Sequence, residues 1–159
     1  MILFREIMPA DDKAVAKLVR SNLKAYGHDL PGTVYYDDGL DHLSGFYLMS
    51  GKKRYYCIAE EDGRVVGGIG LAEFDFFDDC AEMQKLYLDD SVKGKGIGYR
   101  LIGKIEEKAL ELGYKKLYLE THTSLQAAIH IYEKCGYTEI EKPAGVVHAA
   151  MDRFFMKEL

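Results

Sequence analysis

The stretch AEMQKLYLDDSVKGKGIGYRLI, residues 81–102, decides the fold. Its first part is rich in apolar and β-forming side chains and predicts a strand. Gly94, Gly96 and Gly98 then occupy alternate positions directly before an amphipathic run, which ends at Gly113, a typical C-terminal cap. We therefore expect a strand, a glycine-rich turn and a helix in this order, an arrangement that commonly binds a phosphate group at the helix N-terminus.

Two familiar phosphate-binding loops are excluded by the spacing of this stretch. A dinucleotide-binding fingerprint would need a glycine where Tyr99 stands. A Walker loop would need Ser or Thr after Gly94 and Lys95, where the chain has Gly96, so no hydroxyl is placed to bind magnesium. What remains is a set of backbone N–H groups converging on an anion at the positive end of a helix, with Lys93 adding charge. The alternative is that the glycines only turn the chain and the lysines are solvated.

The remainder of the chain predicts strands and helices on both sides of this stretch. Asp62 and Gly63 supply the tight turn of a hairpin between two β-rich runs, and Asp11 is expected to accept the first unpaired N–H groups of a helix. The expected strands are 2–7, the two arms of the hairpin in 55–74, 80–88, 115–120, 137–140 and 152–159, and the expected helices are 11–23, 43–49, 97–112 and 124–134. The segment 26–39 is polar and rich in turn residues. This order predicts a single mixed-sheet α/β domain over residues 1–159.

Composition and charge restrict the class of protein further. With 159 residues, 48% apolar and 30% charged, the chain is expected to form one ordinary globular core. Its 26 acidic and 21 basic residues give a net charge of −5, which argues against nucleic-acid binding and favours a cationic or polar small substrate. No apolar run reaches the length of a membrane span and the N-terminus does not fit a signal peptide, so we expect a cytoplasmic protein without a membrane partner. Three distant cysteines and scattered histidines predict neither disulfides nor a metal site.

The stretch at residues 81–102, followed by LQAAIHIYEKCGY at residues 125–137, resembles the GCN5-related N-acetyltransferase (GNAT) superfamily, and the likeness covers nearly the whole chain. The resemblance implies an acyl-CoA N-acyltransferase fold, with a mixed, mostly antiparallel twisted sheet flanked by helices and a splayed central strand pair. It also implies acetyl-CoA as the acetyl donor. The family's loop has the form Gln/Arg-x-x-Gly-x-Gly/Ala, which residues 93–98 match with Lys93 in the first place, a substitution that keeps the charge.

The resemblance assigns several backbone groups to the cofactor. The residues whose amides are expected to surround the pyrophosphate are Lys93, Gly94, Lys95, Gly96, Ile97, Gly98 and Tyr99. The strand before the loop is expected to bulge and splay, so that pantetheine bonds to the exposed backbone of Leu86, Tyr87 and Leu88. An opened strand edge leaves amides unpaired, and the amides of the cofactor can satisfy them. The N–H of Leu86 is then expected to face the thioester oxygen and stabilise its developing negative charge.

Two side chains are candidates for proton transfer. By resemblance, Tyr132 is the general acid that protonates the departing CoA thiolate, whereas by its spacing it completes the apolar stripe of its helix. A base is also needed, because an alkylamine is mostly protonated at neutral pH. Glu82, four residues before Leu86, stands where several relatives have a glutamate base, and it shares a face with Gln84 if the strand alternates regularly. The alternative for Glu82 is an ion pair with a core arginine or lysine.

Two positions leave the family pattern incomplete. Many relatives carry an asparagine seven residues before the tyrosine, where this chain has Leu125, so no side-chain cofactor contact is assigned to that helix. His148 lies in a glycine-containing segment before the last strand, where relatives often close the acceptor pocket. It is either a catalytic histidine or an ordinary hydrogen-bonded or exposed one.

The acceptor is expected to bind at residues 22–47, the part of the chain that sets acceptor specificity in the family. The aromatic and acidic side chains there suit a small-molecule amine or a peptide N-terminus or lysine, although the carboxylates could equally be helix caps. The expected function is direct transfer of acetyl from acetyl-CoA to a primary amine in a ternary complex. The alternatives are a non-catalytic acyl-CoA-binding regulatory module, a hydroxyl or thiol acceptor, and a longer acyl chain. The final segment DRFFMKEL could support a homodimer, or its charges could simply protect an edge strand.

Overall fold

The computed structural model describes residues 1–31, 34–146 and 150–159, and its elements follow the predicted order. The strands within these ranges are Ile2–Glu6 (β1), Tyr55–Glu61 (β2), Arg64–Glu73 (β3), Cys80–Leu88 (β4), Lys116–Thr121 (β5), Thr138–Ile140 (β6) and Arg153–Glu158 (β7). The α-helices are Asp12–Ala25 (α1), Leu43–Tyr47 (α2), Ile97–Glu111 (α3) and Gln126–Lys134 (α4). Short 3₁₀ turns cover Pro9–Asp11 (η1), Val34–Tyr36 (η2), Asp38–His42 (η3) and Asp90–Val92 (η4). No helix in these ranges is both long enough and apolar enough to cross a bilayer.

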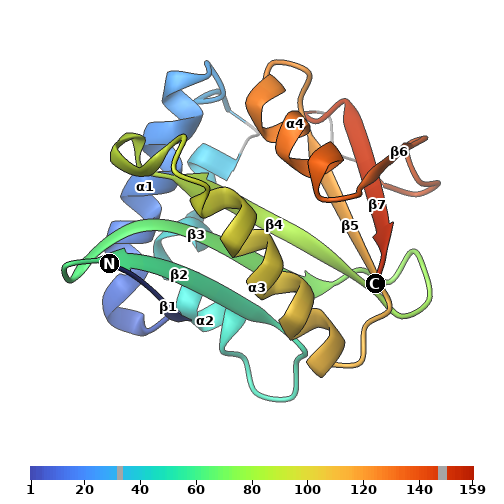
Figure 1. The fold of residues 1–159 in the computed structure, drawn as a ribbon, viewed down its shortest axis with the longest axis horizontal. Coiled ribbons are helices and arrows are strands. Elements are labelled where there is room, and N and C mark those ends of the chain that lie inside the picture. The colour runs from blue at the N-terminus through green and yellow to red at the C-terminus, as the bar shows by residue number, and fades with distance from the viewer. Residues whose placement is uncertain (32–33, 147–149) are drawn as a thin grey trace.

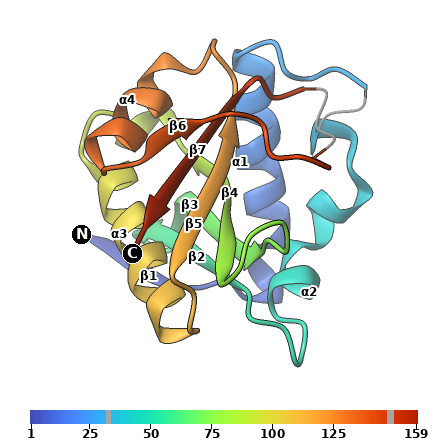
Figure 2. The same cartoon turned by 90° about the vertical axis from the view of Figure 1, so that its right-hand side faces the viewer.

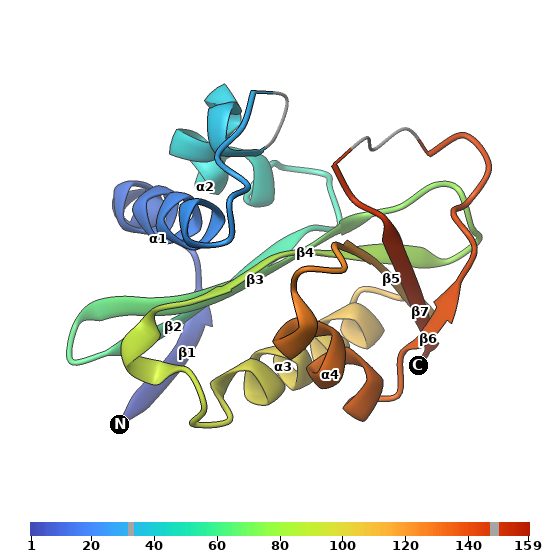
Figure 3. The same cartoon turned by 90° about the horizontal axis from the view of Figure 1, so that it is seen from above.

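The strands form one twisted sheet in the order β1-β2-β3-β4-β5-β7-β6. Neighbouring strands are antiparallel except β4 and β5, which run parallel because the chain passes from one to the other through α3. Figure 1 shows α3 crossing the sheet, and Figure 3 shows α1 and α2 on one face of the sheet with α3 and α4 on the other. The predicted mixed, mostly antiparallel sheet flanked by helices is therefore confirmed.

Both faces of the sheet bury apolar side chains against helices. Along β2, Cys57 and Ala59 pack on the α3 side of the sheet, whereas Tyr56 and Ile58 pack on the α1 side. A strand covered on both faces is apolar on both, which is why four consecutive residues of β2 are buried. The predicted apolar stripe of α1 is buried along its whole length and consists of Val15, Leu18, Val19 and Leu23.

The start of α1 differs in detail from the prediction. A 3₁₀ turn precedes the helix, which begins at Asp12. The carboxylate of Asp11 accepts a hydrogen bond from the backbone N–H of Met8 at 2.8 Å and two from the guanidinium of Arg5 at 2.8 and 2.9 Å. Asp11 therefore holds the turn between β1 and α1 and does not cap the first amides of the helix.

Two glycines of β3 make room for two buried tyrosines. A Cβ atom on Gly68 would lie 2.4 Å from the ring of Tyr56, and one on Gly70 would lie 2.4 Å from the hydroxyl oxygen of Tyr47. Tyr56 comes from β2 and Tyr47 from α2, and both pass over β3 to reach β4 with their hydroxyl groups. The glycines of β3 thus allow neighbouring elements to hydrogen-bond to the strand that carries the candidate site.

Candidate active site

Strand β4 carries a bulge where it faces β3. In the register of the two strands, Lys85 and Leu86 together stand opposite Ile69, whereas the residues on either side pair one to one. Lys85 has φ +50°, a left-handed conformation that costs a non-glycine residue about 1–2 kcal/mol. The Tyr56 hydroxyl donates a hydrogen bond to the carbonyl oxygen of Lys85 at 3.0 Å. The bulge expected from the family resemblance is therefore present, and a buried tyrosine holds it.

Strand β4 separates from β5 just before the bulge. The two strands pair in parallel only from Cys80 to Glu82, and the last pair places Glu82 beside Tyr118. Beyond this pair the strands diverge, as Figures 1 and 2 show, and in the described structure no strand covers the freed edge of β4. Backbone N–H and C=O groups inside a protein need partners, so a ligand with amide groups can complete the hydrogen bonding of this edge. The predicted splayed strand pair is confirmed.

A cavity of about 260 Å³ opens between the diverging strands. Its wall comes from β4 and β5, the end of α1, the glycine-rich loop and α4. Among the predicted cofactor residues, those in the wall are Leu86, Tyr87, Leu88, Lys93, Gly94 and Gly98. The others follow the same loop into the first turn of α3 outside the wall, and they are Lys95, Gly96, Ile97 and Tyr99. The structure thus brings the strand edge and the loop together around one space, while their role in cofactor binding stays a prediction.

The glycine-rich loop presents unpaired backbone amides in front of α3. Gly94 and Gly96 both have φ +76°, and Gly96 directly precedes the helix. A Cβ atom on either glycine would meet no atom within 4 Å, so glycine is needed here for its conformation, and the outer side of the loop is open. Within the described ranges, the N–H groups of these two glycines and of Ile97, Gly98 and Tyr99 make no backbone hydrogen bond. Unpaired N–H groups at the positive end of a helix are the kind of backbone groups that can bind an anion.

Lys93 stands at the entrance of this loop and lines the cavity. Its Nζ lies 2.8 Å from Oδ1 of Asp90 and 5.7 Å from the ring centre of Tyr26. The Asp90 side chain is 93% exposed, and an ion pair so open to water is weak. The ammonium group can therefore turn from Asp90 to an anion bound at the loop.

Tyr132 lies in the cavity wall on α4. Its ring packs against those of Tyr137 and Phe155, each with a centre-to-centre distance of 6.3 Å, as expected for a residue of the apolar stripe. Its hydroxyl bonds to no residue in the described part of the chain, yet it is not sealed from the cavity. Burial raises the pKa of Tyr132, so the hydroxyl keeps its proton at neutral pH. Tyr132 thus belongs to the apolar stripe of α4 and also lies in the cavity wall, while its role as general acid stays a prediction.

Glu82 belongs to a chain of hydrogen bonds that begins in α2. The Tyr47 hydroxyl donates to Oε1 of Gln84 at 2.8 Å, and Nε2 of Gln84 donates to Oε1 of Glu82 at 2.7 Å. Burial raises the pKa of Tyr47, so this hydroxyl remains a donor at neutral pH. Glu82 and Gln84 therefore share one face of β4, as regular alternation predicts, and the buried tyrosine fixes the orientation of both side chains. Gln84 lines the cavity, whereas Glu82 lies behind it at the point where the strands separate.

Tyr118 and Glu120 on β5 are polar residues of the site that the sequence analysis did not single out. Tyr118 stands beside Glu82 in the parallel register and donates its hydroxyl to Oε2 of Glu120 at 2.7 Å. Burial, together with this bond to Glu120, raises the pKa of Tyr118, so the phenol stays protonated. Glu120 lines the cavity. Two carboxylates thus face the same side of the sheet from the two diverging strands. The missed signal was the alternation of KKLYLE, which directs Tyr118 and Glu120 to one face.

Asn22 in α1 and His28, just after α1, lie in the cavity wall. Nδ2 of Asn22 in α1 donates to the carbonyl oxygen of Leu88 at 3.0 Å and so attaches the helix to the end of β4. His28, just after α1, places its Nε2 3.0 Å from Oγ of Ser124, and its ring meets the His122 ring edge-on at 4.8 Å. The two sides of the splayed sheet are therefore linked across the opening by side chains.

Two carboxylates of the expected acceptor segment, those of Asp37 and Asp41, have structural partners. Asp37 accepts a hydrogen bond from the N–H of Gly39 at 3.0 Å and caps η3. Asp41 pairs with Arg20 through two bonds of 2.7 and 2.9 Å. These two carboxylates therefore act as a helix cap and as a surface ion-pair partner, which is the alternative to acceptor binding. His148 lies outside the described residues, and its role stays a prediction.

Comparison with known proteins agrees with this geometry. Residues 17–137 match the model of the acetyltransferase (GNAT) family. The uncharacterized N-acetyltransferase YjgM of Escherichia coli K12 is 32% identical over 160 residues, which cover 99% of this chain and 95% of that protein. The chain therefore belongs to the GNAT acetyltransferase family and is an enzyme of the acyltransferase class.

Solved structures show the same fold. A GNAT-family acetyltransferase from Staphylococcus aureus Mu50 superimposes with a TM-score of 0.85 at 20% identity, covering 99% of each chain. PaiA N-acetyltransferase from Thermoplasma acidophilum, solved in complex with coenzyme A, gives a TM-score of 0.76 at 16% identity and covers 100% of this chain and 99% of that one. The predicted acyl-CoA N-acyltransferase fold is therefore confirmed.

Proposed function

We propose that the protein transfers the acetyl group of acetyl-CoA to a primary amine, by direct attack of the amine in a ternary complex. One observation carries the proposal: the edge of β4 that β5 leaves uncovered, beside the bulge, opens into the same cavity as the glycine-rich loop and Tyr132. An anion site at one end and unpaired strand backbone along the wall fit a ligand with a pyrophosphate and an amide-bearing arm. The coenzyme A bound by the Thermoplasma neighbour supports this choice of ligand.

Acetyl-CoA, when bound, supplies the acetyl group as an activated thioester. The amides of residues 94 and 96–99, with Lys93, would hold the pyrophosphate, and the backbone of residues 86–88 would hold the pantetheine arm. The N–H of Leu86 would face the thioester oxygen. This N–H belongs to the same peptide unit as the Lys85 carbonyl, which Tyr56 holds at 3.0 Å. Because the C=O and N–H of a trans peptide point in opposite directions, fixing the carbonyl also fixes the direction of the N–H.

The attacking amine must lose a proton, and Glu82 would take it directly or through a water molecule. The hydrogen bonds from Tyr47 through Gln84 leave the carboxylate in one orientation, which favours proton transfer along a fixed direction. Glu120 on the opposite strand would hold the ammonium form of the acceptor before the proton is removed. A pair of carboxylates at the junction of β4 and β5 suits a cationic acceptor.

The leaving thiolate must gain a proton or a hydrogen bond, and the Tyr132 hydroxyl would supply it. The side chain enters the cavity from α4, whereas on the sheet side Glu120 lines the cavity and Glu82 is hydrogen-bonded to Gln84, which also lines it. An acid and a base on different walls can act on the two ends of one transferred group. Burial keeps the phenol protonated because it raises the pKa of Tyr132.

Calorimetric titration with acetyl-CoA, followed by a thiol-release screen over amines, amino acids and peptides, tests the proposal. We expect one molecule of acetyl-CoA bound per chain and release of CoA that depends on an amine acceptor. Binding without release across a broad panel would favour a non-catalytic acyl-CoA-binding module. Release with hydroxyl or thiol acceptors alone would favour another acyl transfer, and the absence of any CoA binding would contradict the proposal as a whole.

A further inference from the structure

The bulge in β4 decides where the side chain of Lys85 points. In a regularly alternating strand Lys85 would face α3, because its neighbour Gln84 reaches Tyr47 on the other face. At the bulge its φ is +50°, and the charges that act on its ammonium group are those of Asp37 and Glu82, both on the α1 side of the sheet. Bulges beside active sites often re-aim a side chain in this way. Lys85 therefore faces the α1 side of the sheet, on which the expected acceptor segment packs.

In the described part of the chain, the ammonium group of Lys85 has no hydrogen-bond or ion-pair partner. The side chain is half-buried and lines the cavity, and within the described ranges it forms no ion pair and no hydrogen bond. Lys157, which is also half-buried, does have such a partner, since its Nζ lies 3.0 Å from Glu106. Loss of hydration lowers the pKa of Lys85. The charges of Asp37 and Glu82 act on this desolvated cation from a distance, and an anionic ligand in direct contact would stabilise it further.

The backbone conformation of Lys85 adds a second cost at the same position. Glycine or asparagine adopts a left-handed conformation more readily than lysine does and would serve a bulge equally well. A non-glycine residue in a sparsely populated conformation beside a candidate active site points to a use for its side chain. For Lys85 the side chain brings one positive charge into a cavity that already has Glu120 in its wall and Glu82 behind it.

We propose that Lys85 binds a carboxylate of the acceptor, so that the substrate is an amino acid or a similar small amine with a carboxylate close to its reacting nitrogen. This inference rests on the proposed N-acetyl transfer and specifies its acceptor. At the bulge Lys85 comes close enough to Glu82 for the two opposite charges to act on each other. A zwitterion matches both: its amine faces the carboxylates, and its carboxylate faces the lysine. A diamine would leave Lys85 unpaired and add a like charge beside it.

Pairs of acceptors that differ only at the carboxylate test the proposal. The values of kcat/KM are measured by thiol release for several L-amino acids and for their amides, with wild type and with Lys85→Gln. The wild type should favour the acids by about 10- to 100-fold, the range expected for one charge-assisted hydrogen bond. Lys85→Gln should remove this preference, with a loss of about 10- to 100-fold on the acids and less than about threefold on the amides. Comparing the two proteins on the same acceptor cancels the different basicity of acids and amides.

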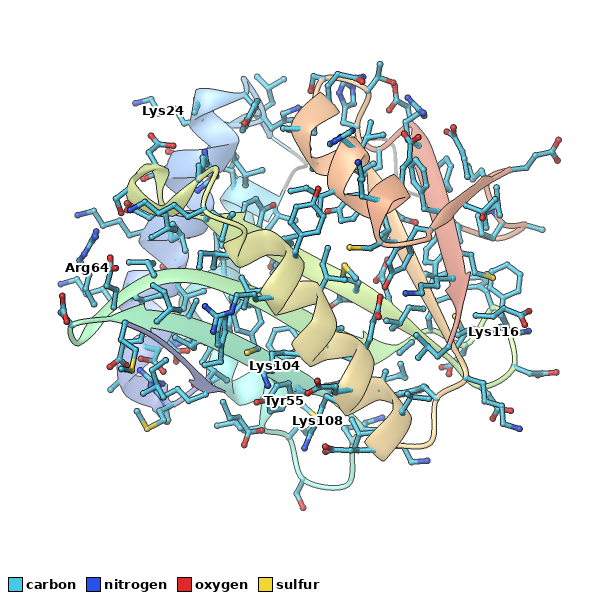
Figure 4. All side chains as sticks on the ribbon, viewed as in Figure 1. Lys24, Tyr55, Arg64, Lys104, Lys108 and Lys116 are labelled. Carbon is cyan, nitrogen blue, oxygen red and sulfur yellow. The ribbon has the colours of Figure 1, made fainter. Side chains whose placement is uncertain are left out.

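Two further variants distinguish the effect of losing the positive charge from an effect on folding. Lys85→Arg keeps the positive charge and should keep most of the preference for acids, with acetyl-CoA affinity like that of wild type. Lys104→Gln removes an exposed lysine of α3, outside the cavity wall and marked in Figure 4, and should change neither class of acceptor. If Lys85→Gln does not fold, the wild-type preference and its retention in Lys85→Arg still decide the question.

The outcomes distinguish this proposal from the proposed function. If Lys85→Gln slows acids and amides equally, Lys85 does not bind the carboxylate, although N-acetyl transfer stands. The same holds if the wild type uses a diamine without a carboxylate as efficiently as the best amino acid. If acetyl-CoA binds but neither amines nor amino acids release CoA, the transfer itself is contradicted, and the assignment of Lys85 with it.

Discussion

Tyr56→Phe tests how the protein holds the peptide unit between Lys85 and Leu86. Tyr56 is 0% exposed, crosses Gly68, and donates to the Lys85 carbonyl at 3.0 Å. Phenylalanine keeps the ring and its contact with Gly68 but removes the donor. The N–H at the other end of this peptide is the Leu86 group proposed to face the thioester oxygen. The substitution therefore acts on the reaction without removing any group that touches the substrate.

The magnitude follows from the hydrogen bond that is lost. A neutral buried bond contributes roughly 1 kcal/mol, and the carbonyl left unpaired adds to the cost, so we expect stability to fall by about 1–2 kcal/mol. For 159 residues this corresponds to a decrease in Tm of about 2–8 °C. We expect kcat to fall by about 5- to 30-fold, less than the roughly 10²- to 10³-fold loss for a whole oxyanion donor, because the N–H is present but less well oriented.

The assay measures kcat by thiol release at saturating acetyl-CoA, acetyl-CoA affinity by calorimetry, and Tm by circular dichroism. Tyr114→Phe is a matched control, since Tyr114 is 8% exposed and donates to the Lys53 carbonyl at 2.9 Å, away from the cavity. It should lower Tm by a similar amount and leave kcat within about twofold of wild type. A Tyr56→Phe enzyme with lowered Tm and normal kcat would refute the reasoning, as would equal losses of kcat in both variants.

Three further predictions concern the proposed catalytic and cofactor residues. Glu82→Gln should lower kcat about 10²-fold and move the rising limb of the kcat/KM profile to higher pH, because only acceptor molecules already deprotonated in solution then react; an unchanged profile would exclude Glu82 as the base. Tyr132→Phe should lower kcat about 10- to 100-fold with little change in acetyl-CoA affinity. Burial raises the pKa of Tyr132 above its usual value near 10, so ionisation of Tyr132 should cause no decrease in wild-type kcat below about pH 10. A Tyr132→Phe enzyme with normal kcat would show that Tyr132 is not the general acid. Gly96→Ala forces alanine to φ +76° and should weaken acetyl-CoA binding at least about 10-fold in calorimetry, whereas Gly103→Ala, within α3, should not; equal affinities would contradict the pyrophosphate assignment.

The parts of the fold that could be predicted are those that local chemistry determines. Gly94 and Gly96 stand where the backbone needs positive φ, and the turn at Asp62 and Gly63 joins β2 to β3 as expected. The apolar stripe of α1 is buried residue by residue. In these places the backbone conformation or apolar face that is needed and the residues that provide it lie close together in the sequence.

The parts that could not be predicted depend on residues far apart in the chain. Lys85 has no local signal for a left-handed conformation, because its conformation is imposed by the register against β3 and by a bond from Tyr56, 29 positions earlier. Glu120 enters the site only because β5 diverges from β4 after three paired positions. The start of α4 also differs from the prediction: the helix begins at Gln126, because Leu125, with φ −93° and ψ 57°, is not helical.

The short pairing of β4 with β5 makes the sheet a structure of two halves. Strands β1 to β4 form one half and β5 to β7 the other, and in the described chain only the pairs from Cys80–Lys116 to Glu82–Tyr118 join them edge to edge. His28 and Ser124 add a link at the far end of the opening. A ligand between the halves contacts both, so part of its binding free energy goes into joining them, and the liganded sheet should resist unfolding as one cooperative unit.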